Sequence, residues 1–191
     1  MFDLDTFLAD CQAAIAETDN HLAVKELVER AVSDPAGIIK ALGEPDRGKA
    51  ERLHVADDLT VMNQSWAPEI MVDPHNHNMW AVIGIYSGRE NNIFWRRIPD
   101  DPQGRIECAG AKSISTGEVA PMGRDVIHTV VNPLRKCTAA LHVYGGAFLT
   151  APQSEWNPET LVEGPRDTQA TMKLFERANA RLDDYKLAAN A

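Results

Sequence analysis

The stretch PHNHNMWAVIGIY, residues 74–86, places two histidines directly before an apolar run. His75 and His77 are separated by one residue, and on an extended chain the side chains at i and i+2 point to the same face. The apolar run ends at Ser87-Gly88, which is typical of a short buried strand. The spacing therefore predicts two imidazoles presented together, an arrangement suited to hold a metal ion. A surface or hydrogen-bonded pair of histidines is the alternative.

Strand-like segments continue on both sides of this stretch. Alternating or β-branched runs occupy residues 59–66, 92–98, 106–108, 112–115, 128–131 and 138–143, with turns rich in Gly and Pro between them. Short strands at nearly regular spacing are typical of an antiparallel sandwich or barrel. We expect this β-barrel to occupy residues 53–150, followed by a loop, residues 150–166, that wraps around it.

Both ends of the chain have a helical pattern. Leu4, Phe7, Leu8, Cys11 and Ile15 form one apolar stripe, and further helices are expected over residues 24–31 and from Asp34-Pro35 to Gly43. Residues 1–45 are thus predicted to be an N-terminal helical extension, and residues 167–190 a C-terminal helix. The whole chain, residues 1–191, is predicted to be a single mainly-β domain.

Composition excludes some classes of function. Hydrophobic residues make up 44% of the 191 residues, enough for a core, and 19 Lys and Arg face 28 Asp and Glu. The net charge of −9 disfavours nucleic acid and anionic membranes as partners. No apolar run approaches the ~20 residues that span a bilayer. We expect a soluble, cytoplasmic protein whose cysteines, Cys11, Cys108 and Cys137, are buried thiols.

Two later segments also carry candidate chemistry. His128 precedes a Val-rich strand, and a barrel can bring that strand beside His75 and His77 to complete three nitrogen ligands. His142 and Tyr144 are again at i and i+2, so the hydroxyl can lie within hydrogen-bond reach of the imidazole. Taken alone, each segment has a structural alternative. His128 can be a histidine packed in the core, and Tyr144 can be a buried tyrosine whose hydroxyl forms a hydrogen bond with the buried His142.

Together and in this order, these segments resemble the cupin superfamily, and within it the non-haem iron thiol dioxygenases of the cysteine and 3-mercaptopropionate dioxygenase group. The first cupin motif matches His75 and His77, and the second matches His128 with Asn132. The glutamate ligand of most cupins is absent, because residues 80–83 are apolar. The resemblance covers most of the chain, including residues 29–35 and 156–160.

The resemblance implies a double-stranded β-helix and Fe(II) held by His75, His77 and His128. It also implies that Tyr144 donates a hydrogen bond to oxygen or substrate while His142 orients the hydroxyl. The chain departs from the family pattern at the relay serine, which is Ala140, and at the cysteine that crosslinks to the tyrosine, which is Val82.

The group that would hold a substrate carboxylate is not placed by the resemblance. Upstream, the matching position falls at Ala50 or Arg52. Downstream, an Arg-Ser-x-Trp motif is replaced by Gln153-Ser154-Glu155-Trp156. The expected site therefore has metal ligands but no assigned anchor for an anionic substrate.

The expected function is an iron(II)-dependent dioxygenase that adds O2 to the sulfur of a small thiol and forms a sulfinate. Its partners would be the thiol and O2, without nucleic acid or membrane, and the oligomeric state is left open. Two alternatives remain: a three-histidine oxygenase acting on a non-thiol such as a diketone, and a non-enzymatic metal-binding cupin that serves as a sensor or binding domain. We expect His21 and His54 at the surface, and Arg96 and Arg97 at a solvated strand edge.

Overall fold

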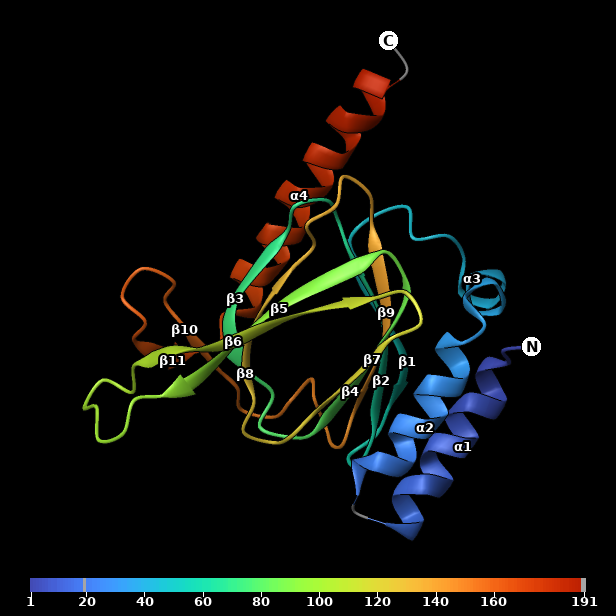
Figure 1. The fold of residues 1–191 in the computed structure, drawn as a ribbon, viewed down its shortest axis with the longest axis horizontal. Coiled ribbons are helices and arrows are strands. Elements are labelled where there is room, and N and C mark those ends of the chain that lie inside the picture. The colour runs from blue at the N-terminus through green and yellow to red at the C-terminus, as the bar shows by residue number, and fades with distance from the viewer. Residues whose placement is uncertain (19, 190–191) are drawn as a thin grey trace.

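The computed structural model describes residues 1–18 and 20–189 (Figure 1). Its helices are α1 (Leu4–Glu17), α2 (His21–Val32), α3 (Pro35–Leu42) and α4 (Thr168–Ala189). Its strands are β1 (Lys49–Val55), β2 (Thr60–Trp66), β3 (Met71–Asn76), β4 (Ala81–Ser87), β5 (Arg89–Arg97), β6 (Ile106–Ser115), β7 (Val119–Met122), β8 (Ile127–Val131), β9 (Thr138–Tyr144), β10 (Ser154–Trp156) and β11 (Glu163–Pro165).

The strands form two antiparallel sheets. One has the order β1-β2-β9-β4-β7, and the other has the order β11-β10-β3-β8-β5-β6. From β2 to β9 the chain passes back and forth between the two sheets, with the β5-β6 hairpin as a pair within one sheet. This winding is a double-stranded β-helix. The predicted mainly-β barrel with N-terminal helices and a C-terminal helix is therefore confirmed.

Alternation along β9 separates two apolar cores. Ala139, Leu141 and Val143 pack in a cluster with residues of α1 and α2, whereas Ala140 and Tyr144 pack in a cluster inside the barrel. Successive side chains of a strand point to opposite faces, so His142 shares the interior face with Ala140 and Tyr144. Val82 lies in the helix-side cluster, on the opposite face from Tyr144.

The N-terminal helices cover the outer face of the five-stranded sheet (Figure 1). α2 lies so close to β4 that a Cβ on Gly84 would come within 2.4 Å of Val28 Cγ1. Asp3 and Asp34 cap α1 and α3, accepting hydrogen bonds from the backbone N–H of Thr6 and Gly37. These local contacts explain why the helices begin where the sequence predicts.

Three expectations need correction. Residues 150–166 contain the short strands β10 and β11, which extend the six-stranded sheet beside β3. Strands of three residues are too short to show a periodic pattern. The strand region begins at Lys49 instead of residue 53. Cys108 is exposed, because it lies on the edge strand β6, whereas Cys11 and Cys137 are buried.

Among the residues that the structure describes, no helix is both long and apolar enough to cross a membrane.

Candidate metal centre

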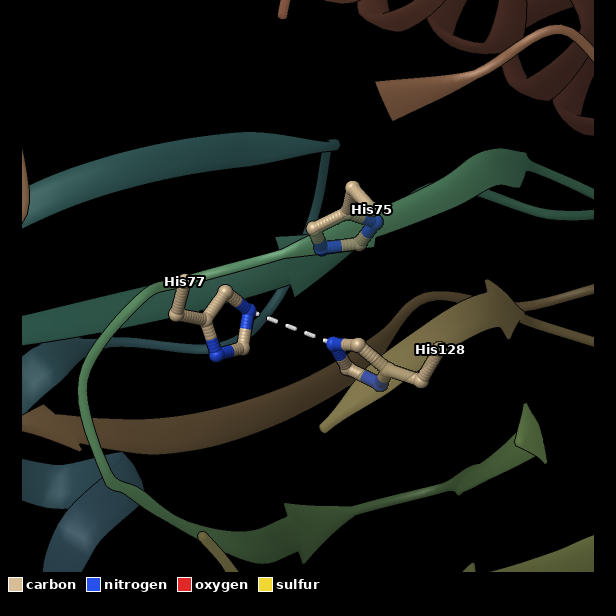
Figure 2. A group of neighbouring side chains, drawn as sticks. All are labelled: His75, His77 and His128. Atoms are coloured by element: carbon tan, nitrogen blue, oxygen red, sulfur yellow. Dashed lines mark hydrogen bonds between the residues drawn. The ribbon is translucent and has the colours of Figure 1, made fainter. Parts of the chain in front are cut away.

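The histidine cluster, His75, His77 and His128, lies inside the barrel. His75 is on β3, His77 is one residue beyond its end, and His128 is on β8. The register of the two strands places His75 directly opposite His128. All three side chains are buried, and Figure 2 shows their rings turned toward one another. One ring nitrogen from each lies within 4.8 Å of the others.

Hydrogen bonds orient two of the rings. Nδ1 of His75 is 2.9 Å from the backbone oxygen of Asp73, and Nδ1 of His128 is 2.6 Å from Oδ1 of Asn92. Both partners are oxygen acceptors, so each Nδ1 carries the proton and each Nε2 keeps a lone pair. Nδ1 contacts of this kind are characteristic of histidines that bind a metal through Nε2.

The spacing of the nitrogens suits a single ion. The Nε2 atoms of His77 and His128 are 3.2 Å apart (Figure 2). Metal–nitrogen bonds of about 2.1 Å would place two nitrogens about 3.0 Å apart at a right angle and about 3.4 Å apart at a tetrahedral angle. The observed distance lies between these two values, so His77 and His128 can hold one ion in either geometry.

Burial keeps the histidines neutral, which is the form that binds metals. Desolvation lowers the pKa of His128 to about 3, and it lowers the pKa values of His75 and His77 well below their usual range. The positive charge of Arg166 also lowers the pKa values of all three, and for His77 the effect of His128 is larger. The histidine cluster is thus available as three neutral donors even in mildly acidic solution.

Tyr144 lies at the edge of this cluster. Its ring is 5.1 Å from the ring of His77 and stacks on Phe148 at 3.8 Å. Its hydroxyl is 2.9 Å from Nδ1 of His142. Burial raises the pKa of Tyr144 far enough to keep the phenol protonated. The predicted pairing of these two side chains is present, and it lies beside the three histidines.

The tautomer of His142 follows from its surroundings. Within the described part of the chain, its buried Nε2 has no hydrogen-bond partner, and the neighbouring position on the same strand face is Ala140. A buried N–H without an acceptor is more costly than a lone pair without a donor. The proton of His142 is therefore on Nδ1 and is donated to the Tyr144 oxygen. The hydroxyl proton of Tyr144 is then free to be donated into the site.

Arg166 was not identified from the sequence as part of the site. It directly follows β11, and its positive charge acts on all three histidines. Its Nη1 donates a hydrogen bond of 2.5 Å to Oε1 of Gln153, and no carboxylate of the described residues forms an ion pair with it. Desolvation lowers the pKa of Arg166, but a guanidinium stays charged in proteins. The sequence showed only an arginine in a polar, proline-containing segment.

Gln153 connects Arg166 to the stacked rings of Phe148 and Tyr144. Its Nε2 donates to the backbone oxygen of Phe148, the residue that stacks on Tyr144. The position at which the resemblance expected an arginine therefore holds the glutamine that supports Arg166. A guanidinium is supplied by the residue that follows β11, because the pairing of Ser154 with Pro165 brings Arg166 beside Gln153.

Two cavities meet at Arg166. One, of about 330 Å³, is also lined by His75 and Glu155. The other, of about 710 Å³, is lined by Met62, Phe148 and Gln153, and also by Ala50 and Arg52, the two upstream candidates for the anchor. Arg52 is exposed, whereas Arg166 is largely enclosed. The two cavities give a small molecule access to the guanidinium.

The other predicted residues lie away from the histidine cluster. Arg96 and Arg97 are exposed, as expected, and pair with Glu107 and Glu163. His21 is partly buried because its ring stacks on Trp80 at 6.1 Å, and His54 is also partly buried. The surface location expected for these two histidines is therefore only partly correct.

No family model matches the chain. Among the solved structures that resemble part of it is oxalate decarboxylase from Bacillus subtilis (15% identity, TM-score 0.37, 48% of this chain and 22% of that chain). Others are an uncharacterized protein with a double-stranded β-helix domain from Klebsiella pneumoniae (12%, 0.43, 57% and 79%) and a conserved protein of unknown function from Streptococcus pyogenes (16%, 0.41, 54% and 77%). The matched part spans less than a quarter of the decarboxylase, which has Mn(II) centres. Function is therefore derived from the side chains of the site.

Proposed function

We propose that this protein is an iron(II)-dependent dioxygenase that adds O2 to the sulfur of a small, carboxylate-bearing thiol and forms a sulfinate. The observation that carries the proposal is the cluster of three neutral imidazoles together with the Arg166 guanidinium, which lines a cavity with His75 and whose charge acts on all three histidines. Neutral ligands leave a divalent ion with its full charge. Together with Arg166, such an ion favours a substrate that presents both a thiolate and a second anionic group.

The donor set suits iron. Imidazole nitrogens are ligands for Fe, Zn, Cu and Ni, whereas Mg and Mn favour carboxylates and other oxygen donors. Bound through the histidine cluster, Fe(II) would supply the redox chemistry that activates dioxygen. The overall reaction, RS⁻ + O2 → RSO2⁻, oxidises sulfur, reduces both oxygen atoms and requires no further reductant.

The protein's own side chains would bind and orient the reactants. The Arg166 guanidinium would pair with the substrate carboxylate, which fixes where the sulfur lies relative to the histidines. The Tyr144 hydroxyl, held by Nδ1 of His142, would donate a hydrogen bond to oxygen or to the substrate. Phe148 and Met62, which line the larger cavity, would exclude water.

The test is oxygen consumption by the iron-loaded protein. The metal-free protein would be loaded with Fe(II) without air, then mixed with O2 and 3-mercaptopropionate, cysteine, mercaptosuccinate or cysteamine. We expect one O2 consumed per thiol, a product heavier by two oxygen atoms, and faster turnover of the thiols that carry a carboxylate. His128→Ala should abolish uptake, and His54→Ala serves as the matched control.

Three outcomes would overturn the proposal. Uptake only with a β-diketone such as acetylacetone would indicate an oxygenase for carbon substrates. Metal binding without uptake with any of the four thiols would indicate a binding protein. Equal activity of the Mn(II)-loaded and Fe(II)-loaded proteins would contradict the assignment of iron.

A further inference from the structure

A chain of hydrogen bonds leads from the histidine cluster to a buried carboxylate. Nδ1 of His128 donates to Oδ1 of Asn92 (2.6 Å), and Nδ2 of Asn92 donates to Oε1 of Glu90 (2.8 Å). The other carboxylate oxygen, Oε2, accepts from Nε1 of Trp66 (2.7 Å). Glu90 and Asn92 have no exposed surface, and His128 and Trp66 are also buried.

The barrel topology brings these residues together. Glu90 and Asn92 are two residues apart on β5, and β5 pairs with β8, which carries His128. Trp66 is on β2, in the other sheet. The Glu90 carboxylate therefore connects the two sheets through hydrogen bonds. No cation of the described residues forms an ion pair with it. Burial raises the pKa of the Glu90 carboxyl, whereas the hydrogen bonds from Asn92 and Trp66 favour the ionised form and lower the pKa.

In its ionised form, the Glu90 carboxylate determines the direction of each hydrogen bond that leads from it to His128. An indole N–H can only donate, and an ionised carboxylate can only accept. Asn92 must therefore turn its NH2 group toward Glu90 and its oxygen toward His128. That oxygen can only accept, so the proton of His128 must be on Nδ1, and the lone pair of Nε2 faces His77.

From this geometry we infer that Glu90 is a positioning residue that sets the tautomer of His128 through Asn92 and thereby prepares the histidine cluster for a metal ion. The inference rests on the metal site of the proposed function, but it is independent of the reaction that follows. Histidine ligands whose outer nitrogen is held by a hydrogen bond are better donors, and loss of such a partner reduces metal affinity about 10- to 100-fold.

Glu90→Gln reverses the direction of the hydrogen bonds that lead from position 90 to His128 without breaking any of them. The glutamine oxygen would accept from Trp66, and its NH2 group would face Asn92. The Asn92 amide would then rotate, presenting its NH2 group to Nδ1 of His128 and moving the imidazole proton to Nε2. All hydrogen bonds are still formed, so the fold should be retained, but Nε2 is no longer a free donor for a metal.

The double variant Glu90→Gln/Asn92→Asp should restore the original direction. A carboxylate at position 92 accepts from the amide introduced at position 90 and from Nδ1 of His128, so the proton of His128 returns to Nδ1. The buried charge is kept and moves by two residues. A merely structural role for Glu90 does not predict this rescue.

The experiment combines two measurements on the same proteins. Nitrogen-15 NMR of the metal-free proteins reports the His128 tautomer: Nδ1–H in the wild type and the double variant, and Nε2–H in Glu90→Gln. Titration with Co(II) should show about 10- to 100-fold weaker binding for Glu90→Gln and recovery in the double variant. Tyr86→Phe is the control, because it removes a buried hydrogen bond, to Asn63, on the helix-covered face.

The two measurements separate failure of this inference from failure of the proposed function. An Nδ1–H tautomer and unchanged Co(II) affinity in folded Glu90→Gln would overturn the role of Glu90. Absence of rescue in a folded double variant would also contradict it. If the wild type bound no Co(II), the metal site would fail, whereas the tautomer of the metal-free protein would still test the direction of the hydrogen-bond chain.

Discussion

Replacing Arg166 with glutamine tests the substrate class directly. The guanidinium is largely enclosed, its identified side-chain hydrogen bond is the one to Gln153, and its remaining N–H groups can pair with a carboxylate. A glutamine at this position can still hydrogen-bond to Gln153, so we expect the fold to be retained. The charge is lost, and with it the bidentate contact to the substrate.

The expected loss follows from the partly buried position of Arg166. Truncating one partner of a buried charged pair costs about 2–5 kcal/mol, and the lower part of this range, about 2–3 kcal/mol, fits a side chain that keeps some contact with solvent. At 1.4 kcal/mol per factor of ten, kcat/KM for 3-mercaptopropionate should fall roughly 30- to 150-fold. For cysteamine, which has no carboxylate, it should change less than about 3-fold.

The assay is initial oxygen uptake over a range of thiol concentrations with iron-loaded wild type and Arg166→Gln. Arg52→Gln is the matched control, because Arg52 lines the same cavity but is exposed. Equal losses with both thiols would show a general disturbance of the site and refute the anchoring role. A large loss in Arg52→Gln with little change in Arg166→Gln would move the anchor to β1.

Three further predictions concern the interior of the barrel. Its four buried histidines have depressed pKa values, about 3 for His128 and His142, so below pH 6.5 the unfolded chain binds protons that the folded chain does not. The free energy of unfolding of the metal-free protein, measured by urea denaturation, should therefore fall from pH 6.5 toward pH 5 by up to about 1.4 kcal/mol per pH unit for each histidine, and a flat profile would contradict this. The serine hydroxyl of Ala140→Ser should donate a hydrogen bond to Nε2 of His142 and stabilise the protein by about 1 kcal/mol in thermal unfolding. The control is Ala139→Ser, which buries a hydroxyl on the helix-covered face and should destabilise the protein by about 1–3 kcal/mol. Tyr144→Phe should lower kcat for oxygen uptake about 10²- to 10³-fold while Co(II) affinity stays the same, and unchanged turnover would favour a binding protein.

Local patterns in the sequence predicted an antiparallel sandwich or barrel and two histidine pairs, and the family resemblance supplied the double-stranded β-helix and the set of three ligands. The His-x-His spacing before an apolar strand, the later His128, and the pairing of His142 with Tyr144 all depend on side-chain alternation, which is a property of the extended backbone itself. Helix caps and glycine stops are equally local, so the helices begin and end close to the predicted residues.

The parts of the site that depend on strand pairing were decided only by the tertiary structure. Arg166 reaches the histidines because β10 and β11 add to the edge of the sheet beside β3, and strands of three residues have no recognisable period. In the sequence, Glu90 precedes the predicted strand 92–98 and Asn92 begins it, and no pattern distinguishes either from an ordinary polar residue. The pairing of β5 with β8 sets Phe94 opposite His128, and the tertiary structure shows that Asn92, two residues before Phe94, reaches the His128 imidazole. The sequence by itself thus determined which side chains can bind a metal. The pairing of distant strands decided which charged groups surround these side chains. Strand pairing brings together residues that are far apart in the sequence, and no local sequence pattern predicts which residues will meet.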